Sequence, residues 1–180
     1  MARRVTLPRR AVTGARHARR RWTSTRGWQG ARCDDARVGR PIPSGVAREA
    51  LAAGLAGAAC SALPSTAWAL LRGDDVLEGA RAVGVMVLPH ERRTPVLLMA
   101  AGTVHLGISL AWSAVIAAVL PRRAEPAWAV AGGVAIAALD LAVIGRRIPA
   151  IRALPQGRQW ADHVAYGLAV GLVLRARRSG

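Results

Sequence analysis

Formal charges divide most of this chain into long apolar runs joined by short basic connections. Residues 50–71 and 95–120 contain no Arg, Asp or Glu, and residues 126–145 contain only one such residue, Asp140. A helix needs about 20 mostly apolar residues to cross about 30 Å of hydrocarbon. The pattern therefore predicts three transmembrane helices, over about 48–71, 94–120 and 126–145.

A fourth apolar stretch is shorter and begins with polar residues. Residues 160–174 include Asp162 and His163 close to their start, and Gly and Ala follow. We expect a helix over 159–174, and its length also suits an interfacial or re-entrant segment. The expected fold is thus all-α, with four transmembrane helices in an antiparallel bundle over 46–175. A basic C-terminal end covers 176–180, and 76–88 is expected to form an amphipathic surface helix.

The first 45 residues have a different character. They hold 12 Arg against two acids, Asp34 and Asp35, without apolar periodicity, which predicts a disordered Arg-rich tail. Several interpretations of the tail remain open. It is a basic arm for anionic lipid or nucleic acid, helped by Trp22 and Trp28, or a cytoplasmic topology anchor, or an extension upstream of a true start at Val46.

Composition supports a membrane protein over a soluble one. The chain is 52% hydrophobic yet carries a formal charge of +16, as expected for apolar helices with basic ends. Every basic residue is Arg and none is Lys, which indicates high-GC codon usage, so no nucleic-acid partner is expected. Cys33 and Cys60 form no CxxC motif, so we expect no metal site, cofactor or disulfide framework.

The charges flanking the helices decide orientation only if the tail is counted. Four helices place both chain ends on one side of the membrane, and without the tail the Arg residues divide six against eight between the two sides. With the tail, the positive-inside rule puts both ends in the cytoplasm. We therefore expect a multi-pass protein of the bacterial cytoplasmic membrane, with the lipid bilayer as its partner.

Four ionisable residues inside the apolar runs fall at similar depths. His105 lies before Leu120 and Asp140 after Pro126, each about 21–23 Å from the intervening connection at about 1.5 Å per residue. By the same reasoning Asp162 and His163 lie about 17–18 Å from that side. Ser61 and Ser65 fall at similar depths. Since ionisable groups in lipid need partners, these residues are predicted to share one polar layer.

Three interpretations of this layer remain open. The groups hold the helices together by hydrogen bonds, or form a proton relay or solute site, or, for Asp162 and His163, lie among headgroups in an interfacial helix. Asp140 has a further possible partner in Arg146 or Arg147, one to two turns away. Tyr166 is expected to donate a hydrogen bond to Asp162, one turn earlier.

Helix packing and helix shape have their own signals. Gly167 and Gly171 form a GxxxG pattern that permits close helix approach and suggests a possible homo-oligomer. Pro64 predicts a kink in the first helix. His105, Ser109 and Trp112 share one face of the second helix, which should point inward.

The sequence contains no catalytic signature such as GxSxG, HExxH or a P-loop, so an enzyme is not expected. From Val46 onward, the stretches REALAAGLAGAACSALPSTAWALLRGDD, LPHERR, ALDLAVIGRRIPAIRALP and ADHVAYG resemble a group of small integral membrane proteins of high-GC bacteria that have no established activity. That resemblance implies a multi-pass membrane protein and assigns no residue a role. The expected function is a structural or accessory membrane component, with a small proton-linked transporter or channel as the alternative.

Overall fold

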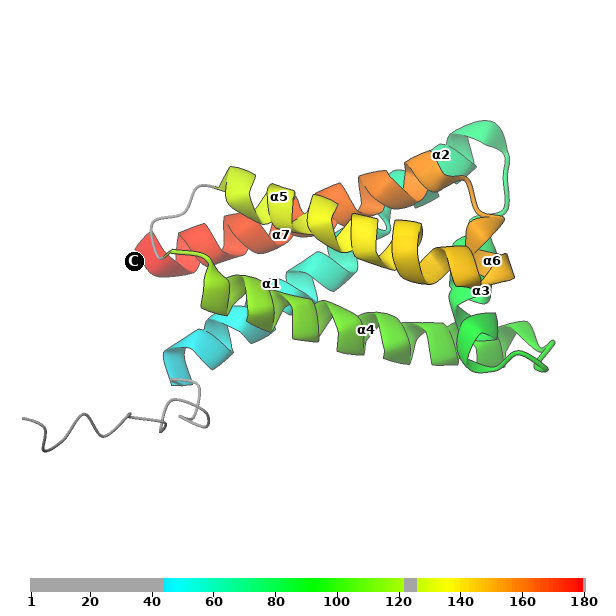
Figure 1. Ribbon diagram of the computed structural model, residues 1–180, viewed down its shortest axis with the longest axis horizontal. Coiled ribbons are helices and arrows are strands. Elements are labelled where there is room, and N and C mark those ends of the chain that lie inside the picture. Colours follow the sequence, from blue (N-terminus) through cyan, green and yellow to red (C-terminus); the bar gives the residue numbers. More distant parts are fainter. Residues whose placement is uncertain (1–43, 122–125, 180) are drawn as a thin grey trace, which may run out of the picture. The chain divides into compact units, whose positions relative to one another are not determined.

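The computed structural model describes residues 44–121 and 126–179, which belong to a single unit, Pro41–Gly180. No strand occurs in these two ranges, so the predicted all-α class is confirmed for them. The predicted tail, apart from Ser44 and Gly45, and the Arg122–Arg123 connection lie outside the described residues. The helices are α1 (Ser44–Ser61), α2 (Leu63–Arg72), α3 (Glu78–Val87), α4 (Thr94–Val119), α5 (Pro126–Ala137), η1 (Ala138–Ile144), η2 (Gly145–Arg147), α6 (Pro149–Arg152) and α7 (Gln156–Ser179) (Figure 1).

Three helical segments are long and apolar enough to cross a membrane: Ser44–Arg72, Thr94–Val119 and Pro126–Arg147. The first consists of α1 and α2, which meet at a break at Ala62, next to the predicted kink at Pro64. The third consists of α5, a π-helical segment η1 and a short 3-10 turn η2. Helix α3 falls inside the range predicted for a surface helix.

The last helix, α7, is longer than the sequence pattern predicts and is not among those three segments. It begins at Gln156, whose side-chain nitrogen donates to the carbonyl oxygens of Ile151 and Leu154. It continues to Ser179, so the residues expected as a separate basic end are helical as far as they are described. Arg is a good helix former, and cations near a helix C-terminus interact favourably with its dipole.

Helix α1 packs against both α4 and α7, and α5 packs against α7 (Figure 1). The directions follow from contacts at the two ends of each pair. Ser113 near the end of α4 reaches Ala50 near the start of α1, whereas His105, earlier in α4, reaches Ala58, later in α1. Arg178 at the end of α7 likewise pairs with Glu49. Helices α4 and α7 therefore both run antiparallel to α1.

Small residues bring these helices together. A Cβ atom at Gly54 would meet the side chain of Ser113, one at Gly57 would meet the ring of Tyr166, and one at Gly133 would meet the backbone of His163. Close backbone approach through Gly is the usual way in which helices associate in lipid. A first core cluster forms around these contacts and includes Ala53, Ala129 and Val170, all fully buried. A second cluster under α3 and α6 includes Ala137, Leu141 and Ile151.

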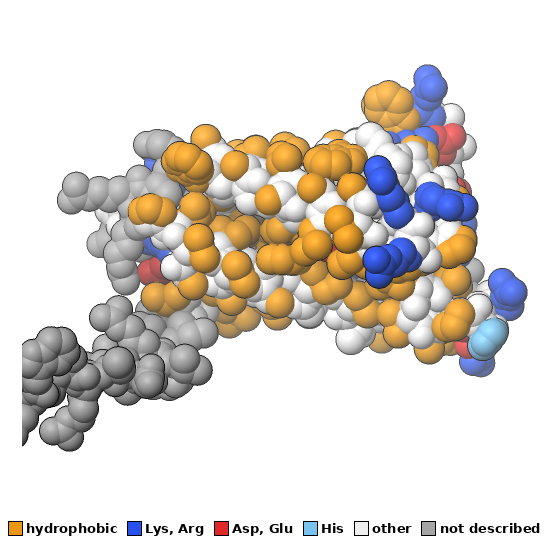
Figure 2. All heavy atoms as spheres, viewed as in Figure 1, with side chains coloured by type: hydrophobic (Ala, Val, Ile, Leu, Met, Phe, Trp, Pro, Cys, Tyr) orange, Lys and Arg blue, Asp and Glu red, His pale blue; other side chains and the backbone are white. Residues whose placement is uncertain are grey.

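The outer surface of the helices is largely apolar. Leu71 is 85% exposed and Met99 74% exposed, and Figure 2 shows hydrophobic side chains along the length of the visible face. Arg side chains gather instead at the end formed by α2, α3 and α6. Large exposed apolar surfaces are rare in soluble monomers, and the change from an apolar body to a basic end fits a helical protein embedded in lipid.

Candidate functional site

The site is organised around the break between α1 and α2. Pro64 has no N–H group, and the chain leaves α1 at Ser61 and enters α2 at Leu63. Ser65 lies in the first turn of α2, where N–H groups lack partners within the helix. Its N–H donates to Oδ1 of Asp162 in α7, at 2.9 Å. Asp162 therefore supplies from a neighbouring helix the capping group that α2 lacks.

His105 of α4 serves the other side of the same break. Its Nε2 lies 3.1 Å from the carbonyl oxygen of Ala58, in the last turn of α1, and 3.1 Å from Oγ of Ser61. A carbonyl oxygen only accepts, so Nε2 carries the hydrogen in this arrangement. Ser61 also donates to the Ala58 carbonyl, at 3.2 Å. His105 thus binds the C-terminal end of α1, and Asp162 binds the N-terminal end of α2, on either side of the break.

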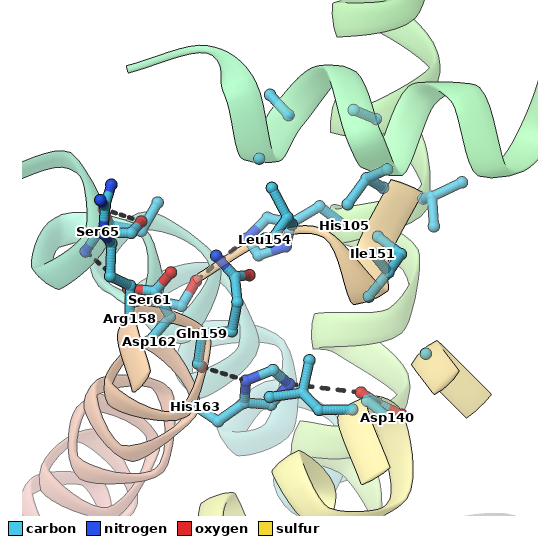
Figure 3. Close-up of a pocket in the computed structure, with 18 of the residues that line it drawn as sticks. Ser61, Ser65, His105, Asp140, Ile151, Leu154, Arg158, Gln159, Asp162 and His163 are labelled. Carbon is cyan, nitrogen blue, oxygen red and sulfur yellow. Dashed lines mark hydrogen bonds and ion pairs between the residues drawn. The ribbon is translucent and has the colours of Figure 1, made fainter. Parts of the chain in front are cut away.

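The remaining pair of predicted residues lies at the π-helix η1. Oδ2 of Asp140 is 3.5 Å from Nε2 of His163, and Nδ1 of His163 is 2.7 Å from the carbonyl oxygen of Gln159 (Figure 3). The suggested pairing of Asp140 with Arg146 or Arg147 is not observed among the described residues. A π-helical turn inside an α-helix is rare and frequently marks a functional site.

Hydrogen-bonding rules limit where the protons of the His163–Asp140 pair can lie. Nδ1 faces a carbonyl oxygen, so it must donate, and a neutral imidazole would then turn a lone pair toward the Asp140 carboxylate. Both side chains are largely shielded, with exposures of 21% for His163 and 27% for Asp140. An attractive contact therefore requires one further proton, either on Nε2 or on the carboxyl group. The His163–Asp140 pair is therefore a candidate proton-binding site.

All four predicted residues line one cavity of about 490 Å³, together with Ser61 and Ser65. Elements α1, α2, α3, α4, η1, α6 and α7 all contribute to its wall, and Figure 3 shows polar side chains from several of them turned toward the same space. This volume lies in the range of small-molecule sites in proteins. The wall also contains apolar side chains, including Ile108, Trp112 and Leu141.

The prediction that Tyr166 donates to Asp162 is wrong. Tyr166 is buried, and its hydroxyl donates to the carbonyl oxygen of Ser109 in α4, at 2.6 Å. Its ring packs against Gly57 of α1, so the side chain points across the helices instead of along its own. One turn after Ser109 in α4, Ser113 donates to the carbonyl oxygen of Ala50, at 2.8 Å. Tyr166 lines the cavity and also belongs to the first core cluster, so it lies at the boundary between the two.

Gly167 and Gly171 are not available for contact with a second copy of the chain. Both are buried, and added Cβ atoms would meet the backbone or side chains of Ala129 and Pro126 in α5. The close approach that their spacing predicted occurs within one chain. Oligomerisation remains a prediction and would need a different surface.

Two charged contacts escaped the sequence-based prediction. Arg178 pairs with Glu49 at 2.9 Å and also donates to the carbonyl oxygens of Ala117, Leu120 and Pro121. Arg158 at the cavity wall donates to Asp74 at 2.6 Å, and its guanidinium lies 5.9 Å from the ring of Trp68. For the Arg178–Glu49 contact, the sequence offered one signal, the acidic Glu49 in a chain in which Glu is rare.

No family model, curated protein or solved structure matches the chain. The resemblance to small membrane proteins of high-GC bacteria stays a prediction. Within the described residues, no group of three or more His, Cys, Asp or Glu side chains is arranged to hold a metal ion.

Proposed function

We propose that this chain is a four-pass protein of the bacterial cytoplasmic membrane and works as a small proton-linked transporter. The proposal takes α7 as the fourth span. Its 24 residues are about 36 Å long at about 1.5 Å per residue. Asp162 and His163 line the cavity, whereas Val164, Leu168 and Leu172, at i, i+4 and i+8, are exposed. The apolar residues on the outer face of α7 suit contact with lipid.

The observation that carries the proposal is the contact between His163 and Asp140, 3.5 Å apart on the wall of a cavity. Ionisable residues inside a membrane protein are costly, and their usual roles include proton relays and ion pathways. Here the pair lies beside a space large enough for a solute, next to a π-helix whose geometry positions Asp140. Proton exchange at this pair would change the charge of the cavity wall.

Reconstitution in liposomes tests this function. Vesicles containing the full chain and an internal pH-sensitive dye are given a membrane potential, with and without gradients of small cations, anions and neutral solutes. The unmutated chain should move protons, and Asp140→Asn and His163→Ala should reduce the flux to that of empty vesicles. Thr103→Ala, on the exposed face of α4, is the matched control and should keep the flux. If the unmutated chain moves no protons under any gradient, the proposal is wrong.

A structural or accessory membrane component is the second candidate, and the α1–α2 break favours it. Two of the four polar residues, His105 and Asp162, have complete roles as partners of backbone groups at that break. Under this alternative the His163–Asp140 pair joins η1 to α7 in the same way. Asp140→Asn would then lower the melting temperature of the purified chain, and there would be no flux to lose.

A further inference from the structure

We propose that the cavity binds a small organic cation with an apolar body, and that this binding expels the proton from the His163–Asp140 pair. This inference rests on the proposed function and adds to it a substrate class and a coupling mechanism.

The charges of the inner wall leave one carboxylate without a counter-ion. His163 and Asp140 are neutral together when they share one proton, and His105 donates from Nε2 to the Ala58 carbonyl oxygen. Asp162 then remains as a cavity-lining carboxylate that forms no ion pair among the described residues. The positive end of α2 offsets part of that charge through the Ser65 N–H.

The charged groups at the rim do not neutralise Asp162. Arg158 also lines the cavity, but its guanidinium is held by Asp74 and stacks near Trp68. Asp75 pairs with Arg81, and Glu78 adds another negative charge. The described wall is therefore negative in balance, and a cation is the complementary ligand.

Asp162 also has an acceptor available. Oδ1 accepts from the Ser65 N–H at 2.9 Å, and this bond occupies only part of the acceptor capacity of the carboxylate. A carboxylate has about four lone-pair sites, so Asp162 can face an organic cation without giving up its bond to α2. Close to the same space lie Ile108, Trp112 and Leu141, which suit an aromatic or aliphatic body. A Trp ring is also the side chain that best attracts a cation through its face.

Coupling to the proton follows from repulsion between two cations in one cavity. At an effective dielectric constant of about 20 and a separation of about 6 Å, repulsion weakens proton binding by roughly a hundredfold. The proton leaves the His163–Asp140 pair for water, and the Asp140 carboxylate, now without a positive partner, is a second negative group for the ligand. Binding of the cation and release of one proton are then a single exchange, as in an antiporter.

Calorimetry on the full chain in lipid nanodiscs tests the binding site, with empty nanodiscs as blank. The probe is benzyltrimethylammonium, and its neutral isostere neopentylbenzene and the anion benzoate are the controls. We expect saturable binding of the cation alone. Asp162→Asn keeps an oxygen that can accept from Ser65 but removes the charge, so the affinity should fall at least about tenfold. Thr103→Ala should bind as the unmutated chain does.

Titrations in two buffers of different ionisation enthalpy, between about pH 5 and pH 8, measure the released proton. We expect release to approach one proton per bound cation, and Asp140→Asn to bind the cation without release. Absence of cation binding, equal binding to Asp162→Asn, or equal binding of the neutral isostere would each overturn the inference. Binding without proton release overturns the coupling. Proton flux without cation binding would overturn this inference and leave the proposed function. Cation binding without proton flux would leave the binding site and overturn the proposed transport.

Discussion

The described residues form two halves that differ in the regularity of their helices. The closed half consists of α1, α5 and the C-terminal parts of α4 and α7, and it contains the first core cluster. The cavity half consists of α2, α3, η1, η2, α6 and the N-terminal parts of α4 and α7. In the closed half the helices are regular. In the cavity half one span is broken at Ala62 and another becomes a π-helix over Ala138–Ile144.

This difference shows how polar groups come to lie inside an apolar protein. In the interior of a regular helix the backbone groups have partners within that helix, so small residues can bring two helices into contact. Where a helix is broken, backbone groups such as the Ser65 N–H need a partner, and a side chain from another helix provides it. Asp162 joins α7 to α2 in this way and lines the cavity that lies beside the break.

The largest expected effect comes from opening the closed half at Arg178. Its side chain is 6% exposed and that of its partner Glu49 is 13% exposed. Arg178→Ala would leave the Glu49 carboxylate and the Ala117 carbonyl group without this partner. Breaking a buried ion pair by removing one member costs about 3–5 kcal/mol, so we expect a loss near 3 kcal/mol in the free energy of unfolding. Denaturant unfolding in detergent, followed by circular dichroism, would measure it.

Arg177→Ala is the control for that substitution, because Arg177 precedes Arg178 on the same helix and is exposed. It should change the free energy of unfolding by less than about 0.5 kcal/mol, as is typical of surface substitutions. Equal losses for the two variants would show that Arg178 acts only through its general charge. The closed half would then depend on helix packing alone.

The second expected effect tests the glycine contacts directly. Gly167→Ala would place a Cβ atom against the carbonyl oxygen of Ala129 and 3.0 Å from Cα of Val130. Both are backbone atoms of α5, so the helices must separate, at a cost of about 2 kcal/mol. Gly102→Ala is the matched control, since nothing lies within 4 Å of its Cβ position. We expect a lower melting temperature for the first variant only, and equal melting temperatures would contradict the proposed packing.

The sequence predicted the closed half better than the cavity half. Charge-free runs indicate spans because the thickness of a bilayer sets their length, and the spacing of Gly167 and Gly171 indicates a close helix contact. The sequence could not show that the partner is α5 in the same chain. Depth along a helix can be counted from the sequence, but rotation about the helix axis cannot. For that reason the four polar residues were expected together, whereas the Tyr166 hydroxyl was assigned to the wrong acceptor.

The irregular backbone explains most of what was missed. A π-helix over Ala138–Ile144 has no recognisable residue pattern, yet it decides where Asp140 points. The cavity likewise depends on how α2 leaves the line of α1 after Pro64. Glu49 and Arg178 lie at opposite ends of the described region and resemble solvated helix termini in sequence. They meet only because α1 and α7 run antiparallel.

The smallest expected effect compares two Arg–Glu pairs of equal length. Arg93 and Glu91 are also 2.9 Å apart, at the connection between α3 and α4, but Arg93 is 76% exposed. Hydrogen bonds from the Arg93 guanidinium, and then from the backbone N–H groups of Arg93 and Arg92, lower the pKa of Glu91 from 4.5 to about 2. A carboxyl group with a lowered pKa in the folded state stabilises the fold above its unfolded pKa, and that stabilisation is lost as the pH falls through the folded pKa.

The difference in stability between the unmutated chain and Glu91→Gln should therefore be constant above about pH 5 and shrink as the pH falls toward about 2. Thermal unfolding of both proteins across this range, in the same detergent, isolates the contribution of Glu91 from that of other carboxylates. Because water screens an exposed pair, the difference should stay well below the loss from Arg178→Ala. A larger effect at Glu91 would mean that the cavity half depends on its outer connection as much as the closed half depends on its buried ion pair.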